Sequence, residues 1–196
     1  FVQMNQKVSQ IALATADNAS RLGLENGLQA RRVFEGDVIQ VFSGAEEQSG
    51  QSDFYDNARI ILSSVELDGD NLPYIHWQRC AGARTYRSSH GNQGAGKSDN
   101  SLEDGIGPDD QKVLPVPSSA VMFVEVSYNY QSLFGLEPFD GREIVQTAAF
   151  NVRETRDLAQ LYVTNANDPV AWCRMGDVPG VAANVDPNQL IDYQAL

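Results

Sequence analysis

The sequence predicts an α+β fold in which an N-terminal helix packs on one side of an antiparallel β-sheet of about four strands. Three observations support this class: apolar residues recur at helical spacing near the start, two later runs alternate between apolar and polar residues, and no βαβ alternation is present. Without that alternation, a doubly wound nucleotide-binding sheet is a poor fit. The 196 residues suffice for one domain, 1–196, with a real core.

Residues 1–22 are predicted to form the N-terminal helix. Apolar and small residues recur there at spacings of three and four, and Gly23 and Gly27 follow as helix-ending residues. The stripe consists of Met4, Val8, Ile11, Thr15, Ala19 and Leu22. Because it is narrow and rich in small residues, we expect it to lie across a sheet or against other subunits. Its first five members are therefore the candidate interface residues.

A second, shorter helix is predicted over residues 33–43. Phe34, Val38, Val41 and Phe42 share one face of it, and Gly44 is the predicted end. Residues 46–56 are polar and rich in Gly and Ser, so we expect a loop there.

Residues 57–67 and 73–80 are predicted to form a β-hairpin. The first run contains Ile60, Ile61, Leu62 and Val65, and the second alternates around Ile75 and Trp77. Asp68-Gly69-Asp70-Asn71 lies between them, and these residue types tolerate the positive φ angles of tight turns.

The strongest strand signals lie in residues 120–130 and 144–153. One face of the first run carries Met122, Val124, Val126, Tyr128 and Tyr130, and the other carries Glu125, Ser127 and Asn129. One face of the second carries Ile144, Ala148, Phe150 and Val152. This period of two is typical of half-buried strands, so we expect two antiparallel neighbours in one sheet, each with a single core face.

Residues 83–112 form a long Gly-rich, acidic segment that we expect to be a decorated loop. It contains Gly91 to Ser98, which matches the P-loop pattern of phosphate-binding NTPases letter for letter. A P-loop needs a buried strand before it and a helix after it, and neither is predicted here. We therefore interpret the match as a coincidence of Gly-rich sequence, with an NTPase as the poor alternative.

The same loop holds five acidic residues that are weak candidates for calcium ligands. They are Asp99, Glu103, Asp104, Asp109 and Asp110. Carboxylate oxygens suit calcium, but the EF-hand spacing fails because Gly105 sits one place late. A solvated acidic loop is the plainer interpretation, and no cofactor is predicted.

The remaining chemistry-bearing residues are few. His76 and His90 do not have zinc-ligand spacing with the cysteines, and no Gly-x-Ser-x-Gly elbow is present, so an enzyme is poorly supported. Cys80 and Cys173 are predicted to form one disulfide, as in an exported protein, and the alternative is two buried free thiols in a cytosolic protein.

The charge and hydropathy of the chain limit its partners. The formal net charge is −12 at pH 7, whereas nucleic acids and anionic membrane surfaces attract positive fields, so we expect no nucleic-acid partner. No apolar run approaches the roughly 20 residues of a membrane span. Because the chain begins at Phe1 within a helical pattern, we expect a further N-terminal part in the full-length protein.

Several stretches, in order, resemble one family. They are Val8 to Ser20 with Ala16-Asp17-Asn18, Trp77 to Gly82, Gly105 to Pro108, Ala120 to Tyr130 continuing into Leu133 and Phe134, and Ala148 to Arg153 followed by Arg156, Asp157 and Leu158. In these stretches the chain resembles the TadE-like minor pilins, which are pseudopilins of the bacterial tight adherence (Tad/Flp) pilus system. Ser132 departs from the pattern, since proline is expected there.

The resemblance implies a type IV pilin-like fold, with a long N-terminal helix whose first half is embedded in the inner membrane or the pilus core. It also implies cleavage by a prepilin peptidase and assembly with other pilins, above all a second minor pilin as a heterodimer. The expected place is the periplasmic side of the inner membrane or an extracellular pilus. The cleavage site and the apolar helix half are not in this sequence.

A second class of function stays open on the residues alone. The acidic loop, residues 83–112, would suit a secreted binding module or adhesin that uses calcium. Calcium should then raise the melting temperature of the protein, and a chelator should lower it.

Overall fold

The computed structural model describes residues 1–26, 29–51, 53–132, 140–153 and 156–173. At 24–26 and 29–30 it describes the backbone alone. The elements are α1 (Val2–Ser20), β1 (Leu24–Asn26), β2 (Gln29–Arg32), α2 (Glu35–Ser49), α3 (Phe54–Asn57), β3 (Ala58–Leu67), β4 (Pro73–Ala81), β5 (Val121–Asn129) and β6 (Glu143–Asn151). The predicted α+β class, an N-terminal helix on an antiparallel sheet of four strands, is confirmed. Among the described residues, no helix is both long and apolar enough to span a membrane.

The main sheet has the strand order β4-β3-β5-β6, and every neighbouring pair is antiparallel. The predicted hairpin is β3 and β4, and the predicted pair of long strands is β5 and β6. Their register runs from Val121 opposite Asn151 to Asn129 opposite Glu143. β3 pairs with β4 and β5, so β4 and β6 form the two edges of the sheet.

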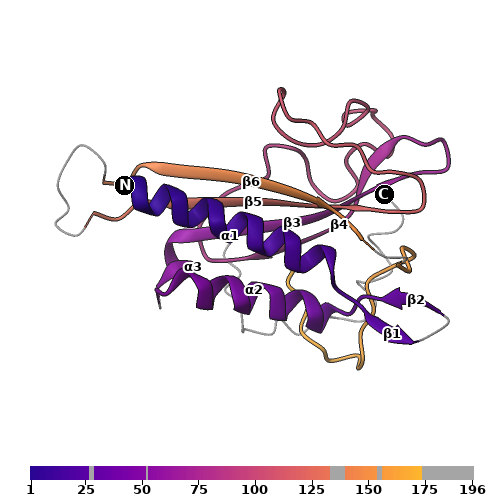
Figure 1. The fold of residues 1–196 in the computed structure, drawn as a ribbon, viewed down its shortest axis with the longest axis horizontal. Helices are drawn as coiled ribbons and strands as arrows, with labels where there is room; N and C mark the ends of the chain where they lie inside the picture. The colour runs from indigo at the N-terminus through magenta and orange to yellow at the C-terminus, as the bar shows by residue number, and fades with distance from the viewer. Residues whose placement is uncertain (27–28, 52, 133–139, 154–155, 174–196) are drawn as a thin grey trace.

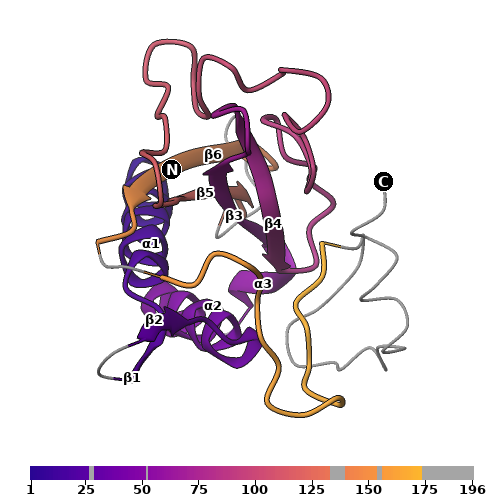
Figure 2. The ribbon, with the colours of Figure 1, turned by 90° about the vertical axis from the view of Figure 1, so that its right-hand side faces the viewer.

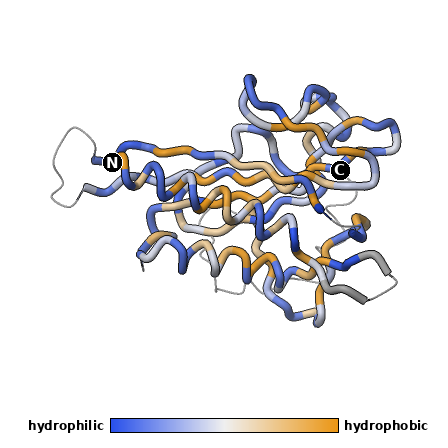
Figure 3. The backbone as a smooth tube through the Cα atoms, in the orientation of Figure 1, coloured by the Kyte–Doolittle hydropathy of each residue, from blue (hydrophilic) through white to orange (hydrophobic). Residues whose placement is uncertain are grey.

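Helix α1 lies lengthwise across β5 and β6, and α2 packs beside it (Figures 1 and 2). Hydrophobic positions recur along both helices between hydrophilic ones (Figure 3). The inner face of α1 meets Val124, Val126 and Ile144 of the sheet in one apolar cluster. This burial fixes the helix on the sheet, since apolar surface removed from water is the main favourable term in folding.

Helix α2 is longer than predicted. It continues through Gly44 to Ser49, and Gly50 ends it in the left-handed conformation, with φ of 63°. Ala45 and Ser49 extend its buried face, which is why the helix does not stop at Gly44. The predicted loop over 46–56 was therefore wrong for the end of α2 and for the short helix α3.

The prediction of half-buried strands was also wrong for β5. All its residues except Asn129 are buried, because residues 82–120 cross the second face of the sheet. Six residues form a separate apolar cluster there: Val65, Ile75, Leu102, Ile106, Val121 and Phe123. The loop has no helix or named strand, although Ile106 and Val113 form an antiparallel bridge. At β5, both faces of the sheet are thus covered by the chain itself.

Candidate interaction surface

The segment that matches the P-loop pattern uses its amide groups internally. The Gly94 amide donates to the carbonyl of Ile75 at 2.7 Å, and the Gly96 amide donates to Oδ1 of Asp99 at 3.0 Å. The Lys97 amide donates to the carbonyl of Gly94. Turns rather than a helix follow Ser98, so these amides are not arranged around a phosphate. The segment instead attaches the loop to β4.

The five predicted acidic residues do not converge. Asp99 accepts hydrogen bonds from the hydroxyl and amide of Ser101 and from the amide of Gly96, and these lower the pKa of its carboxyl. Asp104 and Asp109 each lie near the ammonium of Lys112, at 3.7 and 4.0 Å. Within the part of the chain that the structure describes, no three His, Cys, Asp or Glu side chains are placed to hold a metal ion.

A serine, a glutamate and a histidine meet near one edge of the sheet. The Ser64 hydroxyl donates to Oε1 of Glu66 at 2.7 Å, and Nδ1 of His76 lies 2.8 Å from Oε2 of the same carboxylate. In a hydrolytic triad the imidazole contacts the hydroxyl and the carboxylate lies behind it. Here the carboxylate lies between the two, so this trio does not activate the serine as a nucleophile.

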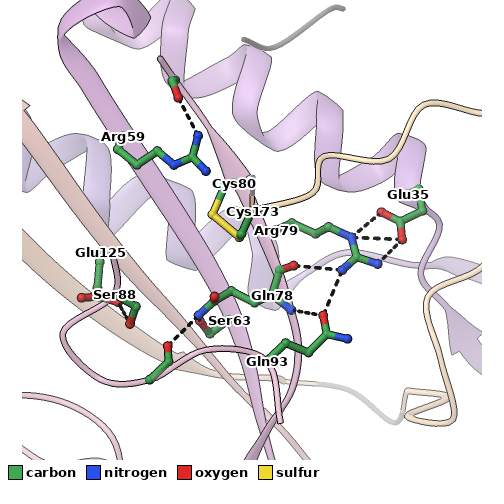
Figure 4. Close-up of a disulfide and its surroundings, with 12 residues drawn as sticks. Glu35, Arg59, Ser63, Gln78, Arg79, Cys80, Ser88, Gln93, Glu125 and Cys173 are labelled. Atoms are coloured by element: carbon green, nitrogen blue, oxygen red, sulfur yellow. Dashed lines mark hydrogen bonds and ion pairs between the residues drawn. A yellow bond between two sulfur atoms is a disulfide. The ribbon is translucent and has the colours of Figure 1, made fainter. Parts of the chain in front are cut away.

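Cys80 and Cys173 form a disulfide that joins the last described residues to β4 (Figure 4). Beside it, the amide of Cys80 donates to the carbonyl of Ala171 at 2.8 Å. The guanidinium of Arg79 stacks over the ring of Trp172, 4.4 Å from its centroid. Covalent, backbone and cation–π contacts therefore hold residues 171–173 against the outer side of β4.

Glu125 lies on the second face of the sheet and is fully buried. Its carboxylate accepts hydrogen bonds from the hydroxyl of Ser88, from the amide and hydroxyl of Ser89 and, at 3.4 Å, from the hydroxyl of Tyr86. A buried carboxylate needs such donors, because burial without them is costly. Glu125 thus anchors the loop to β5, which is a structural role.

The predicted interface stripe of α1 faces the protein's own sheet. Val8, Ile11 and Ala19 are 0% exposed and Thr15 is 2% exposed, while Met4 is half-buried against the same cluster. A side chain with no exposed surface does not contact a second subunit while the fold stays intact. A subunit contact through α1 therefore has to use its outer face, where Val2 and Leu13 are exposed.

Among the residues that the structure describes, the backbone of β6 forms an open edge of the sheet. The Val152 amide donates to the carbonyl of Ala120, and the Tyr130 amide donates to the carbonyl of Arg142. In an antiparallel pair, hydrogen-bonded and non-hydrogen-bonded residues alternate, so these two bonds show which residues of β6 bond to β5. Even-numbered residues of β6 therefore bond to β5. Odd-numbered residues, among them Val145 and Thr147, point their N–H and C=O groups away from the sheet.

The two edges of the sheet differ in cover. At β4, the Ile75 amide donates to the Ala95 carbonyl and the Ile75 carbonyl accepts from Gly94, in addition to the bond from Cys80 to Ala171. At β6, none of the described segments bonds to the outward backbone groups. Sequence alternation missed this difference, because it gives the faces of a strand and not its place in the sheet. An open edge is a template for pairing with another strand.

Comparison with known proteins returned no match: no protein-family description, no curated protein and no solved structure is similar to this chain at a significant level.

Proposed function

We propose that this chain is a structural subunit similar to the TadE-like minor pilins, and that it helps to assemble a tight adherence pilus through contacts between subunits. The helix α1 on a four-stranded antiparallel sheet agrees with the fold that the sequence resemblance implies. The disulfide suits a protein exported to the periplasm or beyond. The proposed role is non-catalytic.

The open edge of β6 is the observation that carries the proposal. The odd-numbered residues of Glu143–Asn151 present backbone donors and acceptors on the outside of the sheet, next to the exposed outer face of α1. Addition of a strand to such an edge is a common way for one protein to bind an extended segment of another. The proposed occupant is an extended segment of a second minor pilin.

A proline substitution separates the proposed contact from the fold. Thr147→Pro removes an amide that points away from the sheet, and proline is tolerated at such edge positions. Ala148→Pro removes an amide that bonds to β5, so it should unfold or strongly destabilise the domain. The melting temperature of Thr147→Pro should therefore stay much closer to that of the parent protein.

The functional readout is the number of pili per cell, counted by electron microscopy. A strain that lacks the gene should have few or no pili, the parent gene should restore them, and Thr147→Pro should restore far fewer. Val145→Lys puts a charge on the same edge and should also restore far fewer pili than the parent gene. Normal piliation without the gene would refute the pilus role, and full rescue by both variants would refute the edge contact.

A further inference from the structure

One flank of α1 lies beside the open edge of β6. The side-chain amide of Gln146 donates to Oδ1 of Asn5 at 3.1 Å, and the guanidinium of Arg153, just after β6, lies 3.0 Å from Oδ1 of Asp17. Because the earlier helix residue meets the earlier strand residue, α1 runs in the same direction as β6. The side of α1 that carries Asn5 and Asp17 therefore follows the edge along its length.

Two exposed apolar residues lie on this same side of the helix. Successive residues of an α-helix are turned by about 100°, so Val2 and Leu13 point between the directions of Asn5 and Asp17. Their exposed fractions are 68% and 48%. The edge flank of α1, as we call this side, consists of Val2, Asn5, Ser9, Leu13 and Asp17.

The opposite flank of α1 is already covered. Lys7 points about 200° away from Asn5, and its ammonium lies beside Gly50, the residue that ends α2. Helix α2 packs along that side (Figure 2). The exposed apolar residues of α1 are thus on the flank that faces the edge of the sheet, and not on the flank that meets α2.

A strand that pairs with β6 would have its two faces in different surroundings. It would lie about 4.8 Å outside β6, and α1 covers β5 and β6, so the side chains of one face would reach the edge flank at Val2 and Leu13. The side chains of its other face would continue a mainly polar, exposed or half-buried row of β6. That row is Glu143, Val145, Thr147 and Asn151.

The spacing along α1 gives the pattern that the incoming strand needs. Val2 and Leu13 are about 16 Å apart along the helix axis, at a rise of about 1.5 Å per residue. A strand rises by about 3.3 Å per residue, and its side chains alternate between faces. Three side chains of one face, at alternate positions, therefore cover most of the distance between the two apolar residues.

We propose that the segment that binds at β6 is an amphipathic strand. It carries aliphatic side chains at three alternate positions, turned to the edge flank of α1, and polar side chains on its other face. Backbone pairing gives affinity without selecting a sequence, whereas the burial of Leu13 and Val2 selects the aliphatic pattern. This inference rests on the proposed function, because it describes the segment of the second minor pilin that occupies the edge.

Two synthetic peptides of equal composition test the pattern. The alternating probe is Lys-Thr-Val-Thr-Val-Thr-Val-Thr-Lys. The scrambled probe, Lys-Val-Val-Thr-Thr-Thr-Thr-Val-Lys, has valine on both faces of a strand. Each carries a fluorescent label, and its binding to the parent protein is measured by anisotropy. The alternating probe should bind saturably and about tenfold more tightly than the scrambled probe, since only its valines gather on one face.

Variants connect the binding to the edge and to the flank. Leu13→Lys places a charge where the valines would pack and should weaken binding of the alternating probe by about tenfold or more. Gln10→Lys is the matched control, because it adds the same charge at an exposed position of α1 outside the edge flank, and it should leave binding unchanged. Thr147→Pro blocks the edge and should weaken the binding of both probes.

The results that would overturn this inference differ from those that would refute the pilus role. Equal binding of the two probes, or equal binding of the alternating probe by Leu13→Lys and the parent protein, would show that the edge flank does not select the strand. Both results would leave the edge contact in place. Absence of saturable binding by the alternating probe would also overturn the inference. The pilus role fails separately, on normal piliation of the strain that lacks the gene.

A second copy of the chain is the other possible occupant of the edge. Self-association of the parent protein in analytical ultracentrifugation, abolished by Thr147→Pro, would assign the edge to that copy and overturn the inference. A parent protein that sediments as a monomer and binds the alternating probe would support it.

Discussion

The guanidinium of Arg79 on β4 lies against both carboxylate oxygens of Glu35, at the start of α2. Nε of Arg79 donates to Oε2 at 2.9 Å and to Oε1 at 3.1 Å, and Nη2 also contacts Oε1. The two side chains are 5% and 2% exposed. Arg79 also reaches the side-chain oxygen of Gln93 at 3.3 Å and the ring of Trp172. This buried pair joins α2, the sheet, the long loop and the C-terminal segment (Figure 4).

Removing one member of this pair should be far worse than replacing both. Glu35→Gln or Arg79→Met alone leaves a buried group without its partner, which costs about 3–5 kcal/mol of unfolding free energy. The double variant Glu35→Leu, Arg79→Met removes both charges, so its loss should be smaller than the sum of the single losses. Urea denaturation of the four proteins measures this coupling.

The exposed ion pair between Arg21 and Asp17 is the matched control for the buried pair of Glu35 and Arg79. Removing the exposed pair should change the free energy of unfolding by less than about 1 kcal/mol. Additive losses for Glu35 and Arg79 would show that the two side chains do not stabilise the fold as a unit.

The apolar patterns predicted most of the fold but not what covers the sheet. Alternation in residues 120–130 identified the face of β5 that packs on α1. Apolar side chains at every second position of a strand lie on the same face, and that face is buried in the core. The second face is closed by the smaller apolar cluster around Phe123 and also through polar contacts, such as those of Ser88 and Ser89 with Glu125. A loop that docks through hydroxyls and amides has the composition of a solvated loop, so hydropathy does not distinguish the two.

The interaction surface was predictable only in part. The spacing predicted the helical stripe of Val8, Ile11 and Ala19. It did not predict whether the stripe faces the core or a second subunit, because that depends on how the helix packs on the sheet, and the stripe is in fact buried in the core. The parallel bridge between Arg31 and Arg156 was not predicted, because the two residues are far apart in the sequence. Only the return of the chain beside β2 brings them together.

The disulfide should contribute a large part of the stability. Cys80 and Cys173 are 93 residues apart, and closing a loop of that length restricts the unfolded chain by about 4–5 kcal/mol. Cys80→Ser with Cys173→Ser should therefore lower the urea midpoint strongly. It should also expose the Cys80 amide to hydrogen exchange, since its partner, the Ala171 carbonyl, would be held less firmly.

Intact mass after alkylation under denaturing conditions, with and without a reductant, checks the bond itself. Two alkyl groups added without a reductant would contradict the disulfide. An unchanged urea midpoint in the double serine variant would contradict its contribution to stability.

Glu143, at the start of β6, should make stability depend on pH in the acid range. A hydrogen bond from Arg84 has the largest effect on the pKa of its carboxyl and lowers it below the ordinary value of 4.5. A hydrogen bond from Ser127 also lowers this pKa. The folded state therefore binds the proton less readily than the unfolded state. The stabilisation is present above about pH 4.5 and is lost as the pH falls through the lowered pKa of the folded protein.

Glu143→Gln should accordingly melt below the parent protein at pH 7, and the difference should shrink steadily as the pH falls below about 4.5. Melting temperatures between pH 7 and pH 3 measure both effects. The effect should be modest, because the Glu143 side chain is 47% exposed and its ion pair with Arg84 is screened by solvent. Glu103→Gln, on the exposed loop, is the control and should follow the parent curve at each pH. A constant difference between Glu143→Gln and the parent across this range would contradict the linkage, because it would mean that the two proteins take up the same number of protons on unfolding.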